Sequence, residues 1–445
     1  MGLNEKAYEN YEFREESITN ITQLLEDEEF HCRSKNGFPG AFTRDRKLNF
    51  KQLIVFLSRG VKSSLQRELD NFYKEATGSE FNIRVATKGA VSRARAKLKP
   101  EAFLELNANV NQTFYSKAPY LVWNHMRLLA IDGTRLVLPN HKSIIDEFGE
   151  HGFGPNADSK RSLALGSCLY DCINLLTLDA QIAPYSSSER DLLYKHLEKV
   201  NSGDLLLLDR GYPSIALLFL LMAKGIRFCM RMKEDWWLSV KDFMESGEKE
   251  RIVNFTLPKK DRPLLKDYPK MFDKQIKCRL ICIELENGEK EVLCTSLTDM
   301  EKFPYEDMSE LYHFRWNVEE SYKLFKARAE VEKFSGKTAL SVKQDFFAKI
   351  FMMSLSAVLA FPIEERVKKE SQEAGLKHQQ KINRTGALAM LMSMSVGMFL
   401  KKLVKKAIAA FDSVVSQTKE IIRPGRKNER KKRPKKLYHM NYKPL

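Results

Sequence analysis

The sequence predicts a mixed α/β protein of more than one domain, and three observations support that expectation. The chain has 445 residues, which is too many for one compact core. Helical periodicity dominates residues 1–120, whereas apolar runs of strand length begin near residue 126. Helical periodicity returns after residue 306. We therefore expect a central α/β domain between two helical regions.

Strand and helix patterns alternate between residues 121 and 234. The apolar run MRLLAIDGT comes first, and residues 162–184 predict two strands with a tight connection near Asp179. A helix over 188–200, the run LLLLD, a helix over 215–224 and the strand IRFCMRMK follow. The resulting order, β-β-β-α-β-α-β, is that of a ribonuclease H-like core.

Residues 235–300 interrupt this alternation. They contain three strand-like runs, RIVNFTLP, IKCRLICIEL and EVLCTSL, and no convincing helix. Asn287-Gly288 indicates a hairpin between the last two runs, because both turn positions need a positive φ. We therefore expect a β-rich insertion within the core. The expected boundaries are 1–120 for an N-terminal helical DNA-binding region, 121–234 and 301–375 for the two parts of the core, 235–300 for the insertion, 376–422 for a C-terminal helical region that serves dimerisation, and 423–445 for a basic flexible tail.

The charge balance points to a polyanionic partner. Lys and Arg total 74 against 58 Asp and Glu, a formal net charge of +16. Residues 423–436 (RPGRKNERKKRPKK) hold nine basic residues and one acidic residue, a net of 9 − 1 = +8. We expect this arm to lie on phosphates; a nuclear-import signal or a solubilising tail are the alternatives. Arg93, Arg95, Lys97 and Lys99 form a second basic segment, for which DNA contact and a solvated helix face are equally good interpretations.

Cysteines and apolar segments exclude several classes of protein. The seven cysteines form no CxxC pair, and this indicates reduced core thiols rather than disulfides or zinc ligands. Residues 350–361 and 386–400 are strongly apolar, but both are shorter than the roughly 18 to 20 residues that span a bilayer. The N-terminal residues are polar and acidic, unlike a signal peptide. We expect a cytoplasmic protein that does not meet a membrane.

Two aspartates attract attention because each follows an all-apolar run. Asp132 ends LLAID, Asp209 ends LLLLD, and a turn that contains glycine follows each of them. Parallel buried strands bring such positions together at one edge of the sheet. Taken singly, each aspartate is better explained as the cap of a turn or helix. Asp179 fits the same pattern but falls where a hairpin is expected.

A third carboxylate belongs to the segment LYHFRWNVEESYKLFK. Tyr312, Arg315, Glu319 and Lys326 are spaced i, i+3, i+7 and i+14, so at about 100° per residue they form one narrow stripe. A polar stripe is not an ordinary core face, and a solvated face with salt bridges is the alternative. Trp316 lies one residue off the stripe; it would stack on an unpaired base or, more simply, belong to the core.

Together these motifs resemble the cut-and-paste insertion-sequence transposases of the DDE class. Tyr312, Arg315, Glu319 and Lys326 match the Y-x2-R-x3-E-x6-K signature of one branch, the insertion-sequence-four-like family. AIDGT and LLLLDRGYP resemble the two Asp motifs, and the β-rich insertion belongs to the same branch. FCMRMK resembles the strand whose arginine, here Arg231, holds the transposon end. EKFSGKT, INRTGAL and HMNYK extend the resemblance to residues 40–445.

The resemblance implies a metal-dependent reaction. Asp132, Asp209 and Glu319 would hold two Mg²⁺ ions, with Mn²⁺ as a substitute, because hard oxygen ligands suit both cations. Tyr312, Arg315, Lys326, Arg231 and Trp316 would contact double-stranded DNA, both transposon ends and target. The family implies a homodimer on DNA and a bacterial, nucleoid-associated protein. A non-transposing nuclease of the same fold and a transposase-derived DNA-binding protein are the alternatives.

Overall fold

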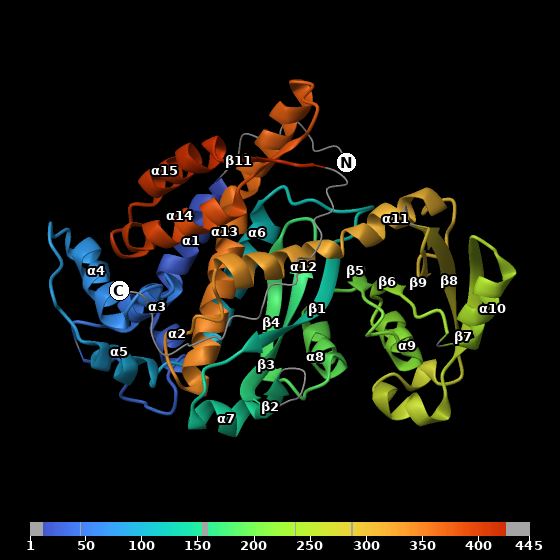
Figure 1. The fold of residues 1–445 in the computed structure, drawn as a ribbon, viewed down its shortest axis with the longest axis horizontal. Coiled ribbons are helices and arrows are strands. Elements are labelled where there is room, and N and C mark those ends of the chain that lie inside the picture. The colour runs from blue at the N-terminus through green and yellow to red at the C-terminus, as the bar shows by residue number, and fades with distance from the viewer. Residues whose placement is uncertain (1–11, 45, 154–158, 236, 286–287, 424–445) are drawn as a thin grey trace.

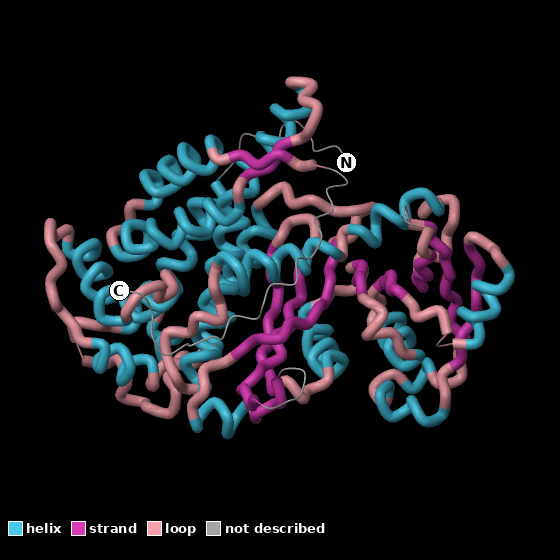
Figure 2. The backbone as a smooth tube through the Cα atoms, in the orientation of Figure 1, coloured by secondary structure: helices cyan, strands magenta, loops and turns pink. Residues whose placement is uncertain are grey.

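The computed structural model describes residues 12–44, 46–153, 159–235, 237–285 and 288–423. A mixed sheet occupies the centre of the molecule, with a helical lobe on one side and a smaller β-rich lobe on the other (Figures 1 and 2). Helices from both ends of the chain form the helical lobe together (Figure 1). The prediction of a mixed α/β protein is confirmed.

Within the part of the chain that the structure describes, nine strands form the large sheet. Its order is β2-β3-β1-β5-β6-β9-β8-β7, and β4 pairs with β3 beside this path. β1 pairs antiparallel with β3 and parallel with β5, and β5 pairs parallel with β6. The strands are β1 (Leu128–Val137), β2 (Glu150–Phe153), β3 (Ser159–Asp171), β4 (Leu176–Pro184), β5 (Leu205–Leu208), β6 (Arg227–Arg231), β7 (Glu250–Thr256), β8 (Gln275–Glu284) and β9 (Lys290–Thr295).

The β-rich segment continues this sheet. β9 pairs antiparallel with β6, and β8 joins β9 to β7. The hairpin expected between β8 and β9 is present and Gly288 has φ +80°, whereas Asn287 lies outside the described residues. The expectation that 235–300 holds no helix is wrong, because α10 (Leu238–Ser246) packs Val240 and Phe243 into the core and ends at the left-handed Gly247. Two 3₁₀ segments, Lys259–Leu265 and Pro269–Met271, also lie in this region.

The connection between β3 and β4 corrects the expected hairpin position. The turn falls at residues 172–175, and Asp179 lies inside β4. Asp171 sets the turn, because its Oδ1 accepts hydrogen bonds from the backbone N–H groups of Ile173 and Asn174, at 2.9 Å each. Asp179 instead contacts the buried ring of His196, with Oδ2 2.6 Å from Nδ1. Asp179 therefore has a structural partner, the buried His196.

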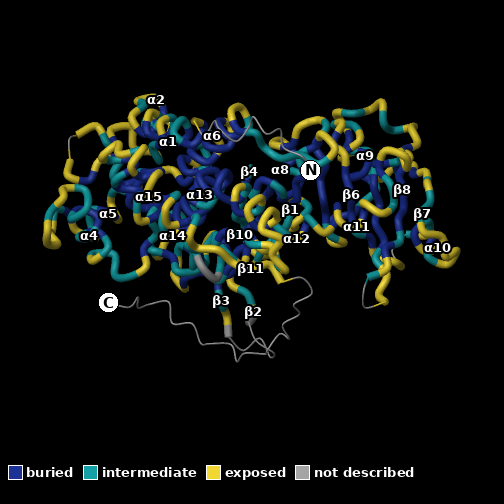
Figure 3. Tube along the Cα trace, turned by 90° about the horizontal axis from the view of Figure 1, so that it is seen from above, coloured by how far each residue is buried: buried dark blue, intermediate teal, exposed yellow. Residues whose placement is uncertain are grey.

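Helices from distant parts of the chain build the helical lobe around α13 (Ala339–Glu373). α13 is long and apolar enough to cross a membrane, yet 94% of its most apolar 18-residue window is buried in the protein. The chain around the α13 label in Figure 3 is largely buried. The others in the lobe are α1 (Glu12–Leu24), α2 (Glu28–Arg33), α3 (Phe50–Ser58), α4 (Leu65–Thr77), α5 (Lys88–Arg95), α6 (Glu101–Lys117), α14 (Arg384–Ser395) with a π-helical extension Val396–Leu400, α15 (Val404–Gln417) and the short pair β10 (Gln380–Ile382) and β11 (Lys419–Ile421). The apolar runs 350–361 and 386–400 are thus helices of this core.

One of the four residues in the expected basic segment is buried. Arg95 is 5% exposed, and its Nη2 lies 2.8 Å from Asp345 Oδ1 of α13. Its guanidinium also donates to Gln344 Oε1 at 2.9 Å and to the Ser341 carbonyl at 3.0 Å. Arg95 therefore ties α5 to the central helix, and the interpretation of this residue as a DNA contact or as part of a solvated face is wrong.

The structure agrees only in part with the expectation for the cysteines and does not describe most of the basic tail. The seven cysteines are free thiols, as predicted, but Cys32 is exposed and does not belong to the core. The basic tail lies outside the described residues, apart from Arg423.

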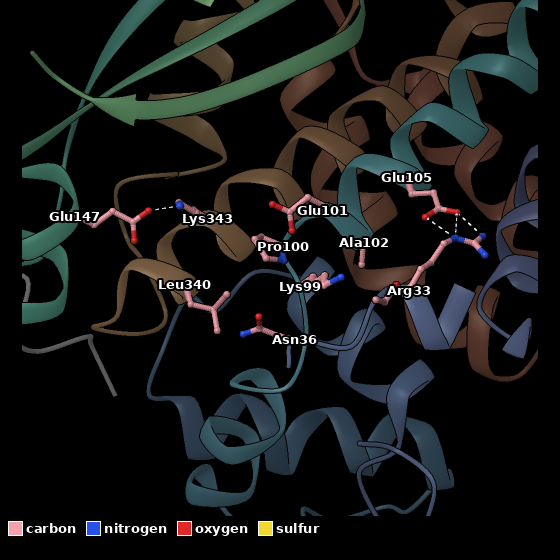
Figure 4. A pocket seen from close by; sticks show the side chains of 11 residues that line it. Arg33, Asn36, Lys99, Pro100, Glu101, Ala102, Glu105, Glu147, Leu340 and Lys343 are labelled. Atoms are coloured by element: carbon pink, nitrogen blue, oxygen red, sulfur yellow. Dashed lines mark hydrogen bonds and ion pairs between the residues drawn. The ribbon is translucent and has the colours of Figure 1, made fainter. Parts of the chain in front are cut away.

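A cavity of about 570 Å³ lies between the N-terminal helices and α13 (Figure 4). Two ion pairs, Arg33–Glu105 and Lys343–Glu147, lie along its wall, and the opposite charges cancel within each pair.

Candidate active site

Asp132 and Asp209 occupy neighbouring positions on β1 and the loop that follows β5. The parallel register pairs Leu128 with Leu205 and Ala130 with Leu207, so continuing it by two residues sets Asp132 opposite Asp209. Asp132 does not end its strand as expected. β1 continues to Val137 because β3 is long enough to pair with it, whereas β5 stops at Leu208. The predicted proximity of the two aspartates thus follows from the end of the parallel ladder and not from the end of β1.

The carboxyl group of Asp132 lies in a poorly solvated place. Burial raises its pKa to about 7, and the nearby Glu319 and Glu189 carboxylates act in the same direction. Arg315 and the backbone N–H of Gly133, 2.9 Å from Oδ1, oppose that rise. A carboxyl group with this pKa exchanges its proton near neutral pH, and a bound cation would favour the ionised form.

The segment with Glu319 consists of two helices and not of one. α11 (Tyr305–His313) ends before Phe314, and α12 (Trp316–Lys323) begins after Arg315. Arg315 nevertheless contacts both neighbours in the stripe: its Nη2 donates to Glu319 Oε1 at 2.7 Å, and its guanidinium carbon lies 5.7 Å from the Tyr312 ring centre. Tyr312 and Arg315 are 4% and 5% exposed. The expectation that the stripe would avoid the core is therefore wrong for these two residues.

Three side chains fasten this segment to the two aspartate strands. The hydroxyl of Tyr312 donates to the carbonyl of Leu208, the residue before Asp209, at 3.3 Å. The hydroxyl of Tyr322 donates to the carbonyl of Asp132. Lys326 lies in a π-helical turn (Leu324–Arg328), and its Nζ donates to the Arg135 carbonyl at 2.6 Å. The helix pair is thus aligned with the backbone on either side of the aspartates.

Trp316 and Arg231 lie in different surroundings. Trp316 is 48% exposed and stacks on His313 with 18° between the rings, so it is not a core tryptophan. Arg231 ends β6, and its Nη1 lies 2.9 Å from Glu291 Oε1 on β9. That ion pair turns the guanidinium toward the β-rich lobe.

A carboxylate that the sequence analysis missed lies beside the aspartates. Glu189 is the first residue of α8 (Glu189–His196), and burial together with the charge of Asp209 raises its pKa. The hydroxyl of Tyr212, three residues after Asp209, is buried and has no hydrogen-bond partner among the described residues. Burial raises the pKa of Tyr212, and the charges of Glu189, Asp132 and Asp209 raise it further.

The donor atoms fit a hard divalent cation, although the carboxylates have not converged. Carboxylate oxygens are the preferred ligands of Mg²⁺ and Mn²⁺. Within the described ranges, however, no group of three or more His, Cys, Asp or Glu side chains lies close enough to hold a metal ion. Arg315 forms an ion pair with Glu319, with 2.7 Å between Nη2 and Oε1.

Comparisons with known proteins identify the family of the chain. The family model described as the transposase DDE domain matches residues 123–355, just over half of the chain, and this range includes Asp132, Asp209 and Glu319. The chain belongs to the transposase DDE domain family. The resemblance to insertion-sequence transposases of the DDE class is thereby confirmed.

A curated relative makes the branch more specific. The transposase InsG for insertion sequence element IS4 of Escherichia coli (strain K12) is 24% identical over 237 residues. The match covers 53% of this chain and 52% of that protein, so the chain spans about half the length of this relative. Among solved structures, the piggyBac transposase synaptic complex with hairpin DNA gives a TM-score of 0.45 at 12% identity, over 89% of this chain and 82% of that one.

Proposed function

We propose that the protein is a cut-and-paste DNA transposase that binds the terminal inverted repeats of its element, cleaves them and joins the 3′-hydroxyl ends to target DNA. The observation that supports the proposal is the parallel register of β1 and β5, which would set Asp132 opposite Asp209 if continued by two residues, with hydrogen bonds that link the Glu319 segment to both strands. The proposed core is ribonuclease H-like, in two parts that flank the β-rich insertion.

Asp132, Asp209 and Glu319 are the residues that would hold the metal. Two Mg²⁺ ions, or Mn²⁺ in their place, supply Lewis acidity at the scissile phosphate and activate the attacking water or 3′-hydroxyl. Asp132 must lose its proton for this role, and its pKa of about 7 makes that step sensitive to pH. Glu319 must leave Arg315, and the freed guanidinium would then be available to a phosphate oxygen.

The remaining residues of the signature would position DNA. Arg315 is buried beside the carboxylates and presents the planar donor set that suits phosphate. Lys326 would add a point charge, and burial already lowers its pKa. Tyr312 would keep the Asp209 loop in place, and the exposed Trp316 would stack on an unpaired base. Arg231 would contact the transposon end only after its ion pair with Glu291 breaks.

The proposed partners and location follow from this chemistry. Double-stranded DNA would contact the N-terminal helical region, the insertion and the basic tail, and residues 376–422 would support a homodimer. The protein would act in the bacterial cytoplasm at the nucleoid.

Cleavage of a cognate DNA end tests the proposal. Asp132→Ala, Asp209→Ala and Glu319→Ala should each abolish nicking in Mg²⁺ and leave end binding largely intact, because carboxylates add nothing to phosphate affinity. Glu320→Ala is the matched control, since Glu320 is exposed and pairs with Lys323 on the same helix. Nicking by Asp209→Ala at the wild-type rate would refute the assignment.

A further inference from the structure

Glu189 lies directly over the glycine that follows Asp132. A Cβ atom built on Gly133 would be 2.6 Å from Glu189 Oε1 and 3.1 Å from its Cδ, so a side chain at position 133 would require this carboxylate to move. A Cβ on Gly211, two residues after Asp209, would lie 3.9 Å from Glu189 Oε2. One carboxylate thus borders both aspartate motifs.

Hydrogen bonds from Arg190 hold the first turn of α8 beside the loop that follows Asp209. Arg190 donates through Nε to the Gly211 carbonyl at 3.3 Å and through Nη2 to the Pro213 carbonyl at 3.1 Å. Ser188 caps the helix by accepting from the Arg190 backbone N–H at 3.2 Å. These bonds tie the first turn of α8, and with it the backbone of Glu189, to the loop after Asp209.

The Glu189 carboxylate has no hydrogen-bond or ion-pair partner among the described residues, although other charged groups lie near it. Asp132 and Asp209 repel it, while Arg315 is engaged by Glu319. The buried hydroxyl of Tyr212 is within electrostatic reach of the same three carboxylates and is also unpartnered. Glu189 is exposed, so its lack of a protein partner is ordinary, but a buried hydroxyl without a partner, as in Tyr212, is rare in folded proteins. A divalent cation with its bound water would balance the carboxylate charges and satisfy the Tyr212 hydroxyl.

We propose that Glu189 is a fourth carboxylate of the metal-dependent centre and acts, together with Asp132 and Asp209, on the divalent cation bound there. This inference rests on the proposed function, because it assumes that Asp132 and Asp209 hold the cation. It assigns Glu189 to the same cation, as a ligand or through a bound water, and it gives Gly133 the role of making space for that carboxylate.

Binding of Mn²⁺ to the metal-free, full-length protein without DNA tests the proposal. The free Mn²⁺ signal in electron paramagnetic resonance reports affinity independently of cleavage. Glu189→Gln should weaken Mn²⁺ binding by about 10- to 100-fold, the range found when groups around a metal are removed. Asp191→Asn is the matched control: it removes an equal charge from the same first helical turn and should leave affinity unchanged.

Three outcomes separate the inference from the proposed function. Loss of affinity in Asp132→Asn, Asp209→Asn and Glu189→Gln, with Asp191→Asn unchanged, supports both. Loss in the two aspartate variants with Glu189→Gln equal to Asp191→Asn overturns the inference and leaves the proposed function standing. Wild-type affinity in both aspartate variants overturns the proposed function, and the inference with it.

A second variant, Gly133→Ala, tests the position of the same carboxylate by adding a side chain beside it. Gly133→Ala should displace Glu189 and lower Mn²⁺ affinity, because its Cβ would overlap Oε1. In the Glu189→Ala background the same change should add nothing, since the displaced group is already gone. Additive losses in this cycle would contradict the role given to Glu189.

Discussion

Protonation of Asp132 should control metal affinity near neutral pH. With a pKa of about 7, this carboxyl would be about 90% ionised at pH 8 and about 1% ionised at pH 5. A cation binds the ionised form, so the apparent association constant for Mn²⁺ should fall by roughly 90-fold between those values. A carboxyl at its ordinary pKa of 3.8 would lose less than about 10% over the same range.

Titrations with Mn²⁺ at pH 5, 6, 7 and 8 and constant ionic strength would measure this dependence. Arg315 opposes the effect of burial, so Arg315→Ala should raise the pKa of Asp132 and move the midpoint to higher pH. Lys323→Ala removes an equal charge from the exposed face of the same helix and should not move it. A change of less than about threefold from pH 8 to pH 5 would refute the reasoning.

Four more predictions concern stability, positioning and DNA affinity. Asp132→Asn should raise the apparent Tm of the metal-free protein more at pH 8 than at pH 5. Because the folded-state pKa of Asp132 is raised from 3.8 to about 7, the free energy of unfolding of the protein falls as pH rises between those two values, and asparagine removes this loss; equal calorimetric shifts at both pH values would contradict this. Arg95→Ala should cost about 3–5 kcal/mol in denaturant unfolding by leaving the buried Asp345 without its ion-pair partner, whereas Arg84→Ala, which removes the solvent-exposed partner of Asp70, should cost far less; equal costs would refute the buried role. Arg315→Ala and Lys326→Ala should slow single-turnover cleavage of a pre-bound end more than they weaken binding, and Arg315→Lys should not fully rescue; near-normal rates would leave the stripe without a catalytic role. Deletion of residues 423–445 should weaken binding to cognate and random DNA alike and reduce the log–log salt slope by about 0.9 for each phosphate that the arm no longer neutralises; an unchanged slope would show that the arm is not on DNA.

The sequence was informative where one local pattern dictates the structure. Apolar runs predicted β1 and β5. The prediction that Asp132 and Asp209 are neighbours assumed that both strands end there, whereas β1 continues to Val137 and only its parallel pairing with β5 ends. The hairpin of β8 and β9 followed from turn chemistry at Gly288. These predictions depend on a few consecutive residues and on rules that hold for most sheets.

Other features depended on contacts that no local pattern contains. The β3–β4 turn follows Asp171 and not the expected position near Asp179, because the Asp171 carboxylate accepts from the turn backbone. The apolar residues around Asp171 gave no sign of this turn. The predicted stripe from Tyr312 to Lys326 assumed one regular α-helix with about 100° per residue. The break at Phe314–Arg315 and the π-helical turn at Lys326 both change the direction in which later side chains point. Arg95 looked solvent-facing because its partner Asp345 lies 250 residues away.

Glu189 escaped notice for a related reason. An acidic residue in the first turn of a helix is the ordinary complement of the helix dipole, so its sequence context carries no functional signal. Only the fold brings it over Gly133 and beside Asp209. The short motif after Asp132, with glycine where a side chain would collide with Glu189, was the one available sign.

Anomalous diffraction at the manganese absorption edge, on crystals of the protein bound to a cognate DNA end, tests the central claim most directly. We expect anomalous peaks between the carboxylates of Asp132 and Asp209, with Glu319 released from Arg315 and turned toward the same ions. Manganese bound elsewhere, with these three carboxylates more than ~10 Å apart, would contradict it.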